Sequence, residues 1–171
     1  MKKRLLLTIL TYATFQVTAS TAGIPQGASH WVHAQEPDAT GKANGRHAAT
    51  LDVWLARKGE FICGFALQDY GLASWNKSPS GRFAGTIDGN SFTIRFNDSF
   101  SDLTDLGEAR LLLEKSKLII EETKSPAHGY LSLSGHHLQM TQKRMSSHSA
   151  LGLTRCLESK AHQEQYLSGV E

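Results

Sequence analysis

The sequence predicts a mainly β fold: an antiparallel β-sandwich or a small barrel built as a meander of hairpins, followed by a short C-terminal helix. Two observations support this class. Short runs rich in β-branched and aromatic residues recur along the chain, with apolar and polar residues alternating within them. Residues that favour turns separate these runs at short intervals, which is typical of successive hairpins.

The N-terminus has the pattern of a secretory signal peptide. A basic segment, Lys2–Arg4, precedes a short apolar run over 5–15, and small residues follow at Ala19 and Ala22. We therefore expect a cleavable signal over 1–22, with cleavage after Ala19 or Ala22. The protein is then periplasmic or extracellular.

Charge and hydropathy exclude two classes of partner for the remaining chain. The full chain has 18 Lys and Arg against 16 Asp and Glu, and three of the basic residues belong to the signal. Fifteen basic residues then face 16 acidic ones, so the basic surface that nucleic acid requires is missing. No later segment has the roughly 18 apolar residues of a membrane span.

We expect the rest of the chain to hold a flexible leader over 23–46 and a single β-rich domain over 47–171. The leader is polar and rich in Gly and Pro, with few residues to bury. In the domain, 50–55 and 60–67 are predicted strands, and Phe61, Cys63 and Phe65 share one face of the second.

The clearest hairpin joins 82–87 to 91–96. A two-residue turn at 88–89 would place Phe92 opposite Gly85, and one at 89–90 would place it opposite Ile87. Both registers keep the apolar residues on one face.

The segment 108–122 fits either a hairpin turning at Lys115-Ser116 or a helix, and we favour the hairpin because Leu118–Ile120 is rich in β-formers. A further hairpin is predicted over 130–140, turning at Ser134-Gly135.

The two cysteines, Cys63 and Cys156, predict one disulfide, since an exported protein with an even cysteine count usually forms them. We expect Cys156 on the short C-terminal helix. A loop of this length stabilises the fold by about 4–5 kcal/mol in the chain-entropy model.

Motifs for catalysis are missing: the sequence has no Gly-x-Ser-x-Gly, no phosphate-binding glycine loop and no His-Glu-x-x-His. Ser74 and Lys77 match Ser-x-x-Lys, but its companion motifs are absent. We assign no catalytic residue and no cofactor, and expect a binding protein rather than an enzyme.

Metal binding has only weak support. His30 and His33 lie in the leader, and His136-His137 are neighbours whose side chains would point to opposite faces of a strand. The oxygen-bearing residues of the next loop do not have calcium-loop spacing: Asn97, Asp98, Asp102 and Asp105. We therefore assign no metal site.

Two predicted loops combine aromatic residues with small polar ones, as binding loops on β scaffolds do. The residues that we expect to contact a partner are Tyr70, Trp75, Asn76 and Lys77 in the first loop and His128 and Tyr130 in the second.

We expect an exported binding protein of the envelope, such as an inhibitor or immunity-type partner of a secreted or wall-acting enzyme. Its partner would be a protein or a cell-wall glycan. One alternative is a small hydrolase or glycan-binding protein that uses carboxylates such as Asp69, Asp98 or Asp102. The other is a structural or assembly component.

Overall fold

The computed structural model describes residues 23–72, 78–88, 91–102, 104–143, 145 and 147–169, and the predicted signal peptide, 1–22, lies outside them. The elements of the described chain, in order, are β1 (Gly27–Gln35), α1 (Ala39–Ala43), β2 (Ala49–Lys58), β3 (Phe61–Asp69), β4 (Ser80–Asp88), β5 (Ser91–Phe96), β6 (Gly107–Glu114), β7 (Lys117–Lys124), β8 (His137–Thr141), α2 (Ser147–Cys156) and α3 (Lys160–Leu167). None of the helices in these segments is long and apolar enough to cross a membrane.

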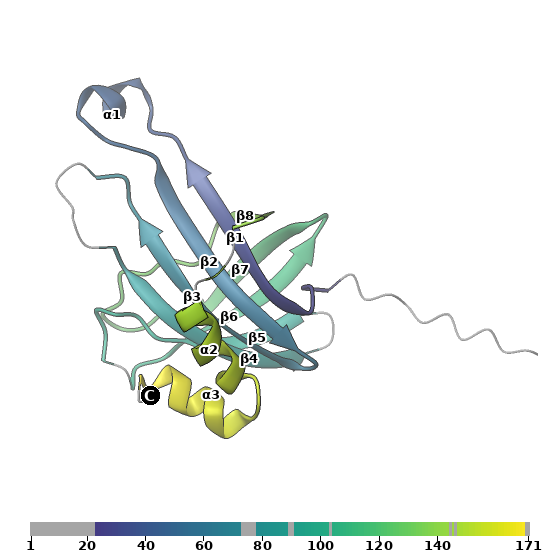
Figure 1. Cartoon of the computed structure of the whole chain (residues 1–171). Coiled ribbons are helices and arrows are strands. Elements are labelled where there is room, and N and C mark those ends of the chain that lie inside the picture. The colour runs from purple at the N-terminus through teal and green to yellow at the C-terminus, as the bar shows by residue number, and fades with distance from the viewer. Residues whose placement is uncertain are drawn as a thin grey trace, which may run out of the picture.

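The eight strands form a closed up-and-down barrel (Figure 1). Each strand pairs antiparallel with the next one in the chain, and β8 pairs with β1 to close the sheet. Closure removes the exposed edges that an open sheet would present. The small-barrel alternative of the predicted fold is thus confirmed, with helices at the C-terminus.

The sequence left two questions open: the register of the 82–96 hairpin, and whether 108–122 is a hairpin or a helix. The strand pairing answers both. In the β4–β5 hairpin Phe92 lies opposite Ile87 and Ile94 opposite Gly85, which is the second of the two predicted registers. The segment 108–122 is the β6–β7 hairpin, with Glu114 paired to Lys117. Lys115 and Ser116 form its two-residue turn with φ of 46° and 67°, the left-handed values that a type I′ turn requires.

The prediction of a flexible leader over 23–46 is wrong for β1 and α1. Strand β1 pairs with β2 along its whole length and with β8 over His30–Val32, so it completes the barrel wall. Trp31 points inward and is buried. The strand escaped detection because its apolar content is low, and its pairing to distant partners stabilises it.

Apolar side chains of the described strands pack together in the barrel interior. Inward positions alternate along each strand and form one apolar cluster that includes Trp31, Phe83 and Phe96. Gly64 leaves room for this packing, because a Cβ there would lie 2.2 Å from the Phe83 ring.

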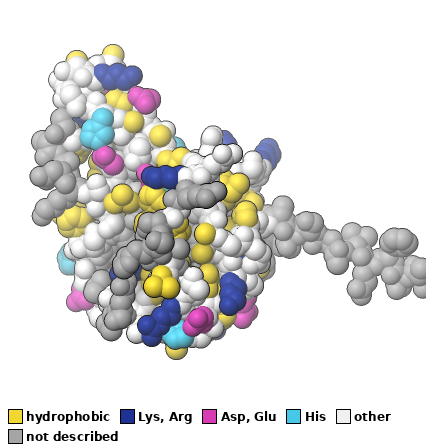
Figure 2. Space-filling view, in the orientation of Figure 1, with side chains coloured by type: hydrophobic (Ala, Val, Ile, Leu, Met, Phe, Trp, Pro, Cys, Tyr) yellow, Lys and Arg dark blue, Asp and Glu magenta, His cyan; other side chains and the backbone are white. Residues whose placement is uncertain are grey.

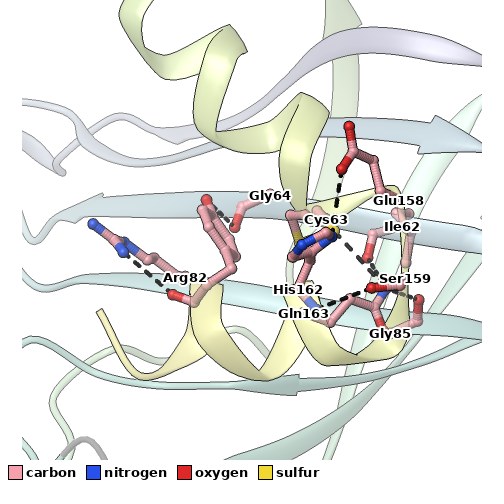
Figure 3. Close-up of a disulfide and its surroundings, with 11 residues drawn as sticks. Ile62, Cys63, Gly64, Arg82, Gly85, Glu158, Ser159, His162 and Gln163 are labelled. Atoms are coloured by element: carbon pink, nitrogen blue, oxygen red, sulfur yellow. Dashed lines mark hydrogen bonds and ion pairs between the residues drawn. A yellow bond between two sulfur atoms is a disulfide. The ribbon is translucent and has the colours of Figure 1, made fainter. Parts of the chain in front are cut away.

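The predicted disulfide between Cys63 and Cys156 is present, with the two Cα atoms 6.2 Å apart. It joins the outer face of β3 to the end of α2, and Figure 3 shows α3 lying beside it across β3 and β4. Gln163 on α3 donates its side-chain N–H to the Gly85 carbonyl at 2.8 Å. Tyr166 donates its hydroxyl to the Gly64 carbonyl at 3.2 Å, so the helix is held by polar contacts as well as by packing.

Candidate functional site

One end of the barrel is closed by a segment that has no regular secondary structure. Three strands, β3, β5 and β7, end here, and a polar residue lies near the end of each: Gln68 in β3, Asp98 two residues after β5, and Glu122 in β7. Asp98 is fully buried and Gln68 is 5% exposed, so both need hydrogen-bond partners inside the protein.

Their partners are the backbone N–H groups of Tyr130–Ser134, which we call the cap segment. Asp98 Oδ2 accepts from Tyr130 at 2.7 Å and also from Leu131. Gln68 accepts from Ser132 at 2.8 Å, and Glu122 accepts from the last two residues of the segment. Five consecutive N–H groups are therefore bound by side chains.

This network corrects the hairpin predicted over 130–140. Only its second half forms a strand, β8, because side-chain oxygens already satisfy the N–H groups of 130–134 that a ladder would need. The alternation of the segment persists nonetheless. Leu131 and Leu133 point into the barrel and are 4% and 1% exposed, whereas Tyr130 points outward and is 53% exposed.

On the outer side of the cap segment, Tyr70, Phe100 and Tyr130 form what we call the aromatic platform. The Tyr130 and Phe100 rings meet edge to face with centroids 5.4 Å apart, and Phe100 is 36% exposed. Tyr70 donates its hydroxyl to the Tyr130 carbonyl. Burial raises the pKa of Tyr70 above its usual value, and the negative charges of Asp98 and Glu122 add to this effect.

Asp98, which is buried at the capped end of the barrel, positions the aromatic platform. Its Oδ1 accepts the N–H of Phe100 at 2.8 Å while its Oδ2 accepts that of Tyr130, so one carboxylate sets both loops. The two aromatic side chains are thus attached to backbone that is held from inside the barrel.

The structure brings together two of the six predicted contact residues, Tyr70 and Tyr130. His128 is exposed in the same β7–β8 connection as Tyr130. Trp75, Asn76 and Lys77 lie outside the described residues. Phe100 was not among the predicted residues, because its only signal in the sequence is an aromatic residue within a polar loop.

The acidic residues considered for hydrolysis or calcium binding have structural partners. Asp69 accepts the Gly71 N–H at 2.8 Å and contacts His47, and these two interactions lower the pKa of its carboxyl group. Asp102 accepts from the backbone and hydroxyl of Thr104, which lowers its pKa as well. Each carboxylate thus orders its own loop.

A second feature lies on the outside of the wall, where His30, Trp54 and Phe65 stack across β1, β2 and β3. The ring centroids are 4.4 Å and 4.8 Å apart in successive pairs. Lys143 lies over the Trp54 ring at 4.9 Å. A pocket of about 370 Å³ opens beside this row, and Met140 and Met145 contribute to its walls. Figure 2 shows hydrophobic side chains near the middle of the face that carries the C-terminal helices.

His30 joins three strands by hydrogen bonds. His30 Nε2 donates to the Asp52 carboxylate at 2.8 Å, and His30 Nδ1 is hydrogen-bonded to Thr141 Oγ1, which also accepts the Lys143 N–H at 3.2 Å. A hydroxyl, an imidazole and a carboxylate in series also occur in hydrolases. Here the Thr141 hydroxyl lies at the end of β8 and accepts a backbone N–H. This series of hydrogen bonds therefore joins β8 to β1 and β2.

Two further histidines meet at the capped end of the barrel. The rings of His33 on β1 and His136 before β8 have centroids 4.8 Å apart, with their planes inclined by 59°. Burial, and then the neighbouring His33, lower the pKa of His136, partly offset by its bond to the Ser132 backbone.

No protein-family model matches the chain, and neither a curated protein nor a solved structure matches it.

Proposed function

We propose that this chain is an exported envelope protein that binds another protein through the aromatic platform, in the manner of an inhibitor or immunity-type partner of a secreted or wall-acting enzyme. The observation that carries the proposal is the exposed Phe100–Tyr130 pair, whose two backbones are fixed by the buried Asp98 carboxylate. Aromatic anchors of this kind dominate protein interfaces.

Preorganisation supports this surface over other exposed apolar residues. A side chain that is already fixed loses little conformational entropy on binding, so more of its contact energy becomes affinity. Leu151 on α2 is more exposed, at 72%, but it stands on a short helix away from the platform. It therefore provides a matched control.

Export is part of the proposal. The disulfide between Cys63 and Cys156 is compatible with an oxidising compartment, in which such bonds form and persist. The signal-peptide pattern over 1–22 would direct the protein to the secretory machinery.

The test begins with a photo-cross-linking amino acid at Tyr130, and in a second version at Leu151, expressed in the native envelope. A captured protein counts only when it rebinds the purified chain. We expect Tyr130→Ala and Phe100→Ala to weaken that binding at least tenfold, about 1.4 kcal/mol, and Leu151→Ala to leave it unchanged.

Thermal unfolding of each variant separates lost binding from lost folding. Equal affinity of all three folded variants would refute the platform as the contact surface. Cross-linking to wall glycan alone from the Tyr130 position would replace a protein partner with a carbohydrate one.

A further inference from the structure

The pair formed by His33 and His136 has no role in the aromatic platform. His33 lies opposite Leu51 in the β1–β2 ladder, so its side chain is on the inward face at the capped end of β1. His136 comes immediately before β8, and its ring meets that of His33. Both side chains are half-buried.

One ring nitrogen of His33 is bound to a backbone carbonyl, and one ring nitrogen of His136 has no hydrogen-bond partner. Nδ1 of His33 is 3.4 Å from the His137 carbonyl oxygen, which can only accept a hydrogen bond. Nδ1 of His136 is buried without a hydrogen-bond partner. A neutral histidine held this way keeps a lone pair on its other nitrogen.

This arrangement is the one that metal-ligating histidines use. In such sites the second ring N–H donates to a carbonyl or carboxylate, which fixes the tautomer and aims the lone pair at the ion. Here the His33 imidazole has such a carbonyl partner, and its ring meets that of His136 at the joint between β1 and β8.

We propose that His33 and His136 bind a divalent transition metal ion of the kind that imidazole prefers, such as Zn²⁺ or Cu²⁺. In the described part of the chain no third His, Cys, Asp or Glu joins them. The other coordination positions are filled by water or by a donor from a bound partner. The proposal is independent of the aromatic platform.

The sequence could not reveal this site. It presents His30-x-x-His33 and His136-His137 as two candidate pairs, and the fold takes one member from each. His30 is instead bound to Thr141 and Asp52, and the side chain of His137 is exposed on the other face of its strand.

His137 therefore supplies a matched control that is adjacent in sequence. We would titrate the untagged protein with ZnCl₂ and follow the histidine ring protons by NMR, with calorimetry for stoichiometry. The variants are His33→Gln, His136→Gln and His137→Gln. We expect one ion per chain, with perturbed signals from His33 and His136. We expect at least tenfold weaker binding for the first two variants and unchanged binding for the third.

Thermal unfolding provides a second measurement that does not depend on the variants being equally stable. An ion that binds only the native state raises Tm, so Zn²⁺ should raise the Tm of the wild-type protein and of His137→Gln, but not that of the other two. Cu²⁺ should bind more tightly than Zn²⁺. Absence of binding to the wild-type protein, or equal losses in all three variants, would overturn the proposal.

Discussion

The buried carboxylate of Asp98 accepts the backbone N–H of Tyr130 at 2.7 Å, which joins the β5–β6 connection to the cap segment. The same side chain binds the N–H groups of Phe100 and Leu131. Asp98 therefore holds the first two residues of the cap segment and positions the proposed binding surface.

Replacing Asp98 by Ala should destabilise the fold strongly. It leaves three N–H groups without their acceptor, and each buried unsatisfied group costs about 1–3 kcal/mol. We expect a loss of about 3 kcal/mol or more in the free energy of unfolding, measured by urea denaturation. Asp105→Ala is the control: Asp105 accepts one N–H, from Ala127, in an exposed setting, so its loss should be about 1 kcal/mol. Equal effects of the two variants would contradict the central role of Asp98.

Alanine substitutions along the cap segment should cost much stability at inward-facing positions and little at outward-facing ones. Leu133 is 1% exposed inside the barrel, so Leu133→Ala removes buried contacts and leaves a cavity, at a cost of about 2–5 kcal/mol. Ser132 points outward, and its backbone bond to Gln68 survives the change, so Ser132→Ala should cost less than about 0.5 kcal/mol. Urea unfolding of the two variants checks this. A small effect of Leu133→Ala would mean that the segment is not packed into the barrel.

Local signals in the sequence predicted the hairpins and the disulfide. The β6–β7 turn at Lys115-Ser116 lies between alternating residues that are close in the chain, and two cysteines allow only one pairing. Strand β1 escaped prediction because its evidence is not local. Its nine residues gain stability from partners in β2 and β8, which no window around them contains.

The candidate site was predictable only in part. Tyr70 and Tyr130 were identified from loop composition, but Phe100 was not. The cap segment could not be foreseen, because Asp98 and Gln68 are 32 and 64 residues away from the N–H groups of Tyr130 and Ser132 that they bind. Such contacts exist only once the barrel has brought the strand ends together.

Reduction of the disulfide should lower the free energy of unfolding while the barrel stays folded. The loop between Cys63 and Cys156 spans 93 residues, which gives about 4–5 kcal/mol in the chain-entropy model. We expect the double variant Cys63→Ala/Cys156→Ala to lose about that much in urea unfolding while keeping its far-UV spectrum, since strand pairing does not involve the bond. Wild-type protein in reductant should behave like the variant. A variant as stable as the oxidised protein would show that α3 contacts alone hold the C-terminus.

Tyr70 should ionise later than an ordinary tyrosine. Burial disfavours its charged form, and the charges of Asp98 and Glu122 add to the effect, so its pKa is raised above 10.0. In a titration followed by ultraviolet absorbance, Tyr70→Phe should remove a component whose pKa is raised above 10.0. The unfolded chain loses this proton near pH 10 while the folded one retains it. Stability is therefore fully present below pH 10 and falls as the pH rises through the folded pKa. Tyr70→Phe should lessen this alkaline loss. Disappearance of a component near pH 10 on Tyr70→Phe would place the hydroxyl in water rather than against the Tyr130 carbonyl.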